Sequence, residues 1–472
     1  PRLNTTLLPF RSEDGRPLDI ERQDISFVER VPVVGGGAVR HQPWLLSDRF
    51  PALAEREVAF ALITLRTGPA ARAGVYRSTL RILGAGGTAE VPVEVEVLDL
   101  GEPPETPGPV LGTVDLSRAE SLFRAYLDAQ PAGPRKALRL AVRRELVSDA
   151  MTALSVAGPG VSRELRVWND PFEEELALLP QAETMTGPTL VNLWSIKYRL
   201  RMKRIEPATQ AYRDHLTRVV DRIKHLARDD LPGGTLLQTS YAETGGQLKA
   251  ARQLGTDLQA AGGRAIVMAN ASMLAGLKDD QFRGQLGAFH ALGLVPDSTS
   301  LARSLKAFRG LGEGRRVFLY SRWPDRYLAG AYAWAVEAEG CYIERVFMQK
   351  GGPYSGFYLW GKAVLVPRPG GKVAATLGML HLRNAADDFR LLHRAESILR
   401  EANKAKVEAK ELDAALSAIR KEALSQRYVV YSRREMRTTA VEPAEWEKRR
   451  DAVIRAAAAV TKRLAEKTSA AR

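Results

Sequence analysis

The chain has 472 residues, 45% of them hydrophobic and 26% charged, which is ordinary for globular proteins and excludes global disorder and a fibrous repeat. Its length allows two or three domains with sizeable cores. The one cysteine, Cys341, excludes an internal disulfide, and no Cys/His cluster at ligand spacing supports a zinc finger. No stretch is apolar over the length of a membrane span, and the start at Pro1 without a basic and apolar leader predicts a processed or trimmed form.

Lys and Arg number 69 against 55 Asp and Glu, so the formal net charge is +14. An excess of this size can attract nucleic acid, an acidic glycan or a membrane surface. Part of it lies in residues 401–472, where 17 basic residues accompany 11 acidic ones. The signs alternate there as on a solvated helix face, and no nucleic-acid-binding module is recognisable, so nucleic acid is not an expected partner.

Residues 1–106 predict an antiparallel β-sandwich domain. Alternating apolar and polar residues fill the segments 58–67, 75–83 and 91–100, and Gly/Pro turns separate them. In the third segment valines and glutamates alternate, which is typical of a strand with one buried and one exposed face. The segment that follows, GEPPETPGP, has four prolines in nine residues and marks a domain boundary.

Residues 107–372 predict an α/β (TIM-like) barrel domain. Helical periodicity runs through 212–230 and 245–263, and a glycine pair ends the second of these helices. Short apolar strand candidates occupy 235–241, 264–270, 292–298 and 316–323. A repeat of strand, loop and helix over this length is typical of a barrel whose active face follows the strands. The positions on that face are Ser240 to Glu243, Asn270 to Ser272, Asp297 to Thr299 and Ser321 to Asp325.

Residues 373–472 predict a mostly helical C-terminal region. Helical texture fills 373–425, a polar connector with a short strand candidate follows, and a final helix starts at about Pro443. This region is rich in Ala, Lys, Arg and Glu. We expect it to pack against the barrel, with the docking of a protein partner as the alternative role.

Three segments of the chain resemble glycoside hydrolase family 123, and together they span about residues 1–400. The first is GVYRSTLRI followed by VPVEVEVLDL, similar to the last hairpin of that family's N-terminal sandwich. In the other two, residues 317–343 and 382–392, the matching positions are Tyr320, Pro324, Arg326, Gly330, Trp334, Leu382, Arg383, Asp388, Phe389 and Leu392. The resemblance implies a sandwich followed by a (β/α)8-type barrel and an exported protein.

The resemblance also implies a chemistry. Family members end a mid-barrel strand in an Asp-Glu pair, in which the Glu protonates the glycosidic oxygen and the Asp orients the substrate's own 2-acetamido group. Here the equivalent strand end is TLLQTSYAETGGQ, with Glu243 at the acid position and Ala242 where the Asp would stand. Loss of such a stabilising group typically costs about 10²–10³ in rate. Asp297 and Asp325, at other predicted strand ends, are the candidates to replace it.

The predicted site therefore has Glu243 as its catalytic residue, although a glutamate at the start of a helix is also favoured by the helix dipole. The predicted substrate-binding residues are Tyr241, Tyr320, Trp323, Asp325, Arg326 and Trp360. Aromatic faces at strand ends can stack on sugar rings or belong to the core, and Arg326 can equally form an ion pair. We expect no metal and no cofactor.

Two hypotheses follow from these residues. The first is a carbohydrate-active protein of the N-acetylhexosaminidase type, either a glycoside hydrolase or a relative made inactive by Ala242. The second is a non-catalytic glycan-binding or structural scaffold module of an envelope or extracellular assembly, with the C-terminal helices docking a protein partner. A glycan or polysaccharide is the expected partner of the hydrolase and of the glycan-binding module, and both hypotheses predict an extracytoplasmic location without a membrane span.

Overall fold

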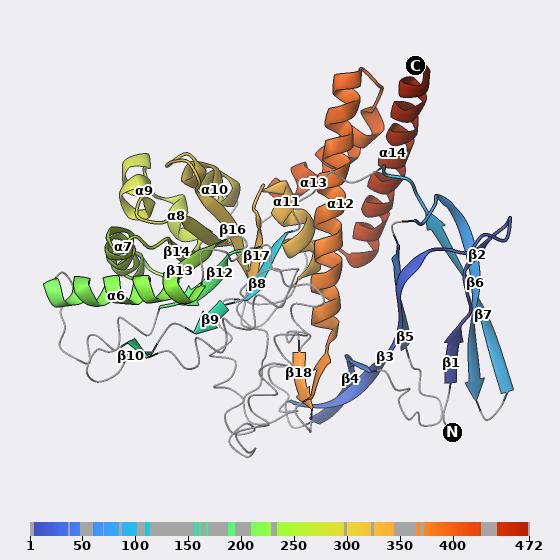
Figure 1. The fold of residues 1–472 in the computed structure, drawn as a ribbon, viewed down its shortest axis with the longest axis horizontal. Coiled ribbons are helices and arrows are strands. Elements are labelled where there is room, and N and C mark those ends of the chain that lie inside the picture. The colour runs from blue at the N-terminus through green and yellow to red at the C-terminus, as the bar shows by residue number, and fades with distance from the viewer. Residues whose placement is uncertain are drawn as a thin grey trace.

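The computed structural model describes residues 4–35, 38–47, 60–68, 70–84, 87–101, 109–113, 155–157, 160–161, 167–168, 187–193, 209–227, 234–296, 300–321, 325–343, 365–368, 372–425 and 441–470 (Figure 1). It combines antiparallel sheets near the N-terminus, a curled sheet of parallel strands with helices packed on it, and long C-terminal helices. The multidomain α/β architecture expected from the sequence is confirmed at this level.

The N-terminal part forms two antiparallel sheets that share one hydrophobic core. Their strands are β1 (Asn4–Leu7), β2 (Arg11–Ser12), β3 (Ile20–Gly35), β4 (Ala38–Ser47), β5 (Phe60–Thr67), β6 (Gly74–Gly84) and β7 (Gly87–Val97). In one sheet β6 pairs with β1, β2 and β7, and in the other β3 lies between β4 and β5. Phe10, Tyr76 and Leu80 are buried in the core, and Ile25 and Ile63 reach it from the second sheet.

Strand β7 shows the alternation expected from its valines and glutamates. Val93 and Val95 are partly buried in the shared core, whereas Glu94 between them is exposed. On the exposed face Arg77 of β6 pairs with Glu94 at 3.0 Å, and other charges repeat this cross-strand pattern. The period of two in the sequence therefore predicted correctly which side of this strand faces the core.

Eight parallel strands form the largest sheet in the described part of the chain. They are β8 (Val110–Thr113), β9 (Ser155–Ala157), β12 (Thr189–Asn192), β13 (Thr235–Ala242), β14 (Ala265–Asn270), β15 (Ala291–Val295), β16 (Arg316–Ser321) and β17 (Gly340–Ile343). Their spatial order is β8-β17-β16-β15-β14-β13-β12-β9. All carboxyl ends therefore lie at one edge of the sheet, and the four strands expected between 235 and 323 are confirmed. A short antiparallel pair, β10 (Gly160–Val161) and β11 (Val167–Trp168), lies outside this sheet.

Helices alternate with these strands along the chain. They are α6 (Gln210–Ala227), α7 (Gly245–Ala260), α8 (Ala271–Ala275), α9 (Asp279–Leu286) and α10 (Leu301–Arg309). Helix α7 begins with a capping box, in which Thr244 and Gln247 exchange side-chain and backbone hydrogen bonds. It ends where the glycine pair was expected to end it. Gly262 has φ of +77°, and its N–H donates to the carbonyl of Gln259 at 2.9 Å.

The two faces of the parallel sheet pack differently. The outer face, with residues such as Leu237 and Ala269, joins the helices in one large hydrophobic cluster. The opposite face, which we call the inner face, is filled by Val110, Leu190, Leu236, Ile266, Met268, Ala291, Val295, Phe318, Tyr320 and Tyr342. A Cβ at Gly293 would lie only 2.1 Å from the sulfur of Met268, so the glycine makes room for this side chain. Side chains therefore fill the middle of the inner face, so a ligand-binding site on this face can lie only at the ends of the strands.

The C-terminal part begins with an antiparallel strand pair and continues as three helices. The elements are β18 (Leu365–Arg368), β19 (Lys372–Ala375), α12 (Leu377–Ala405), α13 (Lys410–Ser425) and α14 (Pro443–Ala470). The final helix starts at Pro443 as expected, and α12 and α14 stand between the parallel sheet and the N-terminal sheets (Figure 1). None of the helices in the described ranges has the length and apolar content that a bilayer crossing requires. The strand candidate at 427–436 lies outside the described residues.

A buried carboxylate joins the C-terminal helices to the chain that follows β16. Asp388 on α12 has no exposed surface, and Arg326 donates to it through Nε at 2.7 Å and Nη2 at 3.0 Å. From α14, Trp446 Nε1 donates at 2.9 Å and Arg450 Nε at 3.0 Å. Arg326 also pairs with Glu447 of α14. Charge-assisted hydrogen bonds thus satisfy both oxygens of Asp388 and tie three segments together.

A second contact lies one helical turn further along the same segments. After Arg326 the chain forms a π-helical turn, η2 (Leu328–Tyr332), and a short helix, α11 (Ala333–Ala335). A Cβ at Gly330 would lie 2.8 Å from the carbonyl oxygen of Ala385, so this glycine allows η2 to approach α12 closely. Trp334 donates to Glu396 of α12 at 3.3 Å. The positions that resemble family 123 in two separate segments therefore meet in one interface.

Two arginines attach the N-terminal sheets to the same helices. Arg394 of α12 donates through Nε and Nη2 to the carbonyl oxygen of Leu100, at 2.9 and 2.6 Å. Arg455 of α14 pairs with Glu96 of β7 at 3.0 Å. The end of β7 and the residues just after it are thus held against both long helices.

We predict that Asp388→Ala destabilises the protein by about 3–5 kcal/mol, because it removes a fully buried carboxylate and leaves the partly buried guanidinium groups of Arg326 and Arg450 without it. Chemical denaturation followed by circular dichroism would measure the change in unfolding free energy. Asp451→Ala is the matched control, since its pair with Arg455 is exposed and the variant should unfold near the wild-type midpoint. Equal midpoints for the two variants would contradict a central role for Asp388.

Candidate functional site

The end of strand β13 is shaped by an irregularity in the sheet. Leu236 faces the inner side and Leu237 the outer side, as alternation requires. Between Gln238 and Tyr241 the register with β14 shifts, which is the mark of a β-bulge. Tyr241, which uninterrupted alternation from Leu237 would place on the outer face, packs instead against the inner cluster. The bulge therefore turns an aromatic side chain toward the inner face at the point where the strand ends.

Three side chains from different strands meet there. The ring of Tyr241 lies 5.0 Å from the ring of Tyr320, the partner in β16, at an angle of 35°. The Tyr241 hydroxyl donates to Oδ1 of Asn270, the last residue of β14, at 2.5 Å. Tyr320 is only 1% exposed, so its ring supports Tyr241, which is partly exposed. The sequence therefore placed Tyr241 and Tyr320 correctly at one edge; contact of either with a ligand stays a prediction.

Glu243 lies at the rim of the same edge. Ala242 is level with Ala269 in the neighbouring strand, so one further residue brings Glu243 level with Asn270. The side chain of Glu243 is exposed, and its backbone N–H donates to Oε1 of Gln247 at 2.7 Å in the first turn of α7. Glu243 thus lies next to the start of α7, and its side chain is an accessible carboxyl group beside Tyr241.

Ala242 points the other way. It is fully buried and belongs to the outer cluster, together with Leu248 of α7. The position at which family 123 would carry its Asp is therefore packed under a helix. A carboxylate introduced there would be buried among apolar atoms instead of facing the inner edge, which would be costly.

Asp325 and Arg326 take part in other contacts. Asp325 is 5% exposed; its Oδ1 accepts the N–H of Leu328 at 2.8 Å, and Oδ2 finds no hydrogen-bond partner among the residues that the structure describes. It acts electrostatically on the thiol of Cys341, an outer-face residue. Arg326 belongs to the ion-pair cluster of Asp388 described above. Their contact with substrate stays a prediction, whereas Asp297, Trp323 and Trp360 lie outside the described residues.

Burial raises the pKa of Asp325 from 3.8 to about 7, so the folded state holds its proton more tightly than the unfolded chain. Burial of the protonated Asp325 therefore costs no extra free energy below pH 4. As the pH rises toward 7, the folded protein loses stability relative to the unfolded chain, because the unfolded chain gives up this proton first. We predict that Asp325→Asn removes this dependence. The stability of the variant relative to wild type should grow by roughly 4 kcal/mol at most between pH 4 and pH 7, because each pH unit between the two pKa values is worth about 1.4 kcal/mol.

Denaturant unfolding at several pH values would measure this difference. The histidines titrate in both proteins and cancel from it. Parallel stability curves for Asp325→Asn and wild type would show that the buried carboxyl group is not the source of the dependence.

Sequence reasoning missed one polar residue on the inner face. Gln238 is 4% exposed, and its Oε1 has no hydrogen-bond partner within the described part of the chain. It lies two residues after Leu236 and therefore faces the same side. A glutamine within the apolar segment TLLQTSY was the available signal, since a polar residue in a buried strand calls for a partner.

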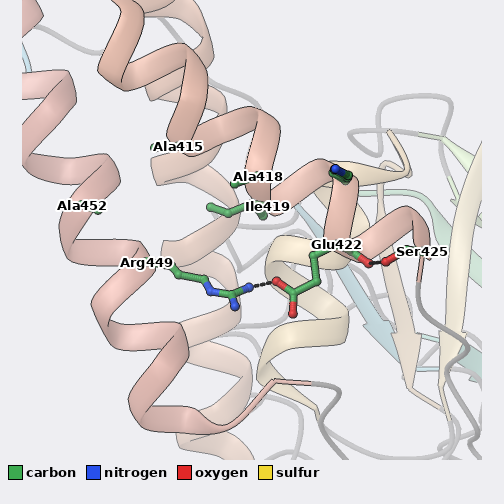
Figure 2. Close-up of a pocket in the computed structure, with 8 residues that line it drawn as sticks. Ala415, Ala418, Ile419, Glu422, Ser425, Arg449 and Ala452 are labelled. Carbon is green, nitrogen blue, oxygen red and sulfur yellow. Dashed lines mark hydrogen bonds and ion pairs between the residues drawn. The ribbon is translucent and has the colours of Figure 1, made fainter.

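A cavity of about 560 Å³ lies elsewhere, between α13 and α14. Figure 2 shows Arg449 of α14 reaching Glu422 of α13 across it. The other lining residues are Ala415, Ala418, Ile419, Lys421, Ser425 and Ala452. This cavity belongs to the C-terminal helices and contains none of the residues at the strand ends.

Among solved structures, the chain is similar to a family 123 glycoside hydrolase from Clostridium perfringens that was studied for glycolipid glycan hydrolysis. The TM-score is 0.69 and the sequence identity is 11%. The match covers 100% of this chain and 90% of that one. An endo-β-1,4-mannanase from Thermotoga petrophila (TM-score 0.38, 10% identity, 61% and 78% covered) is too dissimilar to support an argument. No protein-family model and no curated protein matches the sequence. The resemblance to family 123 expected from the sequence is thus confirmed as a shared fold.

Proposed function

We propose that this chain is a carbohydrate-active protein that takes a glycan with 2-acetamido sugars at the carboxyl ends of its parallel strands. The observation that carries the proposal is the convergence of Tyr241, Asn270 and Glu243 at one edge of a sheet whose middle is filled. Tyr241 offers an aromatic face, Asn270 an amide and Glu243 an accessible carboxyl group. These are the group types that bind sugars and act on glycosidic bonds.

The architecture that fits this function is a closed barrel behind an N-terminal sandwich. Strands β8 and β9, the two edges of the parallel sheet, are also its first and second strands along the chain. Pairing between them would complete a TIM-like barrel with the strands in chain order. We accordingly propose a sandwich domain at residues 1–106, a barrel at 107–372 and a helical region at 373–472. Family members are mostly exported, so an extracytoplasmic location belongs to the same proposal.

Glu243 is the residue proposed to act as general acid and base if the protein hydrolyses its ligand. Cleavage of a glycosidic bond normally needs a second carboxyl group within about 5 to 10 Å of the first. The hydrophobic residues that fill the inner face, from Leu236 to Tyr342, leave no room for it in the middle of the sheet. Hydrolysis therefore requires a carboxylate from another segment, for which Asp297 is the candidate that follows β15.

The alternative is a glycan-binding module without catalysis. Ala242 favours it, because this position lies under α7 and cannot be the source of the second carboxylate. In this reading the aromatic and amide groups bind the sugar, Glu243 adds a hydrogen bond, and the C-terminal helices dock a protein partner.

We predict that wild type releases the chromophore from aryl N-acetyl-β-hexosaminides if the first reading is correct, and that Glu243→Gln lowers this rate by at least about 10²-fold, because the proton donor is removed. Release of nitrophenol over time measures the rate. Glu313→Gln, an exposed glutamate in a different loop, is the matched control and should leave the rate unchanged.

Absence of turnover in wild type, together with binding of the same glycosides, would favour the binding module. Full activity in Glu243→Gln would exclude Glu243 as the acid. Absence of both turnover and binding would contradict the carbohydrate function itself.

A further inference from the structure

Four basic side chains meet at the edge of the parallel sheet where its strands begin, opposite the proposed glycan site. Arg264, His290 and Arg315 directly precede the neighbouring strands β14, β15 and β16. A Cβ at Gly262 would lie 2.9 Å from Nζ of Lys224, so this lysine reaches the same edge from the last turn of α6. We call Lys224, Arg264, His290 and Arg315 the basic edge.

The basic edge has no acidic partner. Within the part of the chain that the structure describes, no carboxylate forms an ion pair with any of its four side chains. Other arginines at the same end of the sheet are paired, Arg316 with Glu339 at 2.6 Å and Arg309 with Glu337 at 3.3 Å. The excess of positive charge is therefore local to the basic edge and does not extend to its neighbours.

The two half-buried members of the basic edge are held in place by the protein. Nη2 of Arg315 donates to the carbonyl oxygen of Gly287 at 2.9 Å, and the guanidinium lies 5.6 Å from the centre of the Phe308 ring. Burial, and then the charges of Arg315 and Arg264, lower the pKa of His290. Nη1 of Arg315 and Nδ1 of His290 are buried and find no hydrogen-bond partner among the described residues. The protein thus leaves polar nitrogens at this edge without a counterpart, which is unusual for buried groups.

The other two members of the basic edge are exposed. Lys224 and Arg264 make no hydrogen bond and no ion pair with any residue in the described ranges, so their charges face solvent. Adjacent strands lie about 4.8 Å apart, so the positions from Arg264 to Arg315, two strands further on, extend over about 10 Å. This length suits several negative groups carried by one chain better than a single small ion.

We propose that the basic edge binds an acidic polysaccharide through its sulfate or carboxylate groups. Guanidinium groups form paired, charge-assisted hydrogen bonds with such oxyanions, and a lysine adds a mobile point charge. The bases of a single-stranded nucleic acid would instead need exposed aromatic rings to stack on. In the described part of the chain the exposed aromatic side chain is that of Phe60, which belongs to β5. The inference is independent of the proposed function, because the basic edge lies at the opposite ends of the strands from Tyr241 and Glu243.

Titration calorimetry tests the proposal with dextran sulfate, polygalacturonate, neutral dextran and a single-stranded oligodeoxynucleotide as probes. Wild type should bind at least one of the two acidic polysaccharides about tenfold or more tighter than it binds the oligonucleotide or neutral dextran. Lys224→Gln/Arg264→Gln should weaken that binding by about tenfold and reduce its dependence on salt concentration, because two charge contacts are lost. Arg264→Lys keeps the charge and should stay within about threefold of wild type.

Lys404→Gln/Lys462→Gln is the matched control, because it removes the same charge from exposed positions of α12 and α14 and should change the affinity by less than about twofold. Should the first double variant fail to fold, the single variants Lys224→Gln and Arg264→Gln replace it, each with an expected loss of about threefold. Equal losses in the two double variants overturn the inference, since net charge alone then explains the binding. Tighter binding of the oligonucleotide than of either acidic polysaccharide, or no binding of those two by wild type, overturns it as well.

Discussion

The structure depends on one buried carboxylate. Asp388 has no exposed surface and would be very costly if it were alone, but Arg326, Trp446 and Arg450 satisfy both of its oxygens. These partners come from the segment after β16 and from the last helix, so one side chain fixes where the C-terminal helices sit on the parallel-sheet unit. Gly330 allows the π-helical turn after Arg326 to approach α12 closely in the same interface. Three segments far apart in sequence are thereby held in one arrangement.

The candidate site depends on a different local constraint, the bulge before Tyr241. Without it, alternation along β13 would turn Tyr241 under the helices. With it, Tyr241 meets Asn270 and Tyr320 at the inner edge, and Ala242 is the residue that is buried under α7. One extra residue in β13 therefore determines that the side chain of Tyr241 faces the inner edge and that the side chain of Ala242 is buried under the helix.

Much of the fold could be predicted from local pattern. The alternation from Val91 to Val97, the apolar strand segments and the glycine pair at Gly262 each reflect a rule that acts within a few residues. The site could be predicted only in part. Nothing local reveals the bulge, and the pairing of Arg326 with Asp388 joins residues 62 positions apart. The sequence alone therefore could not distinguish an arginine that binds a glycan from one that holds two helices together.

The attachment of the N-terminal sheets to the long helices bears on how the chain reaches its final form during synthesis. Leu100 and Glu96 leave the ribosome early, whereas Arg394 and Arg455, which hold them, emerge near the end of translation. The early sheets can acquire their own core first, since Phe10, Tyr76 and their neighbours are local to them. Their docking is complete only when the last helix has been made, so a nascent chain stalled before that point would carry folded sheets without the ion pair between Glu96 and Arg455.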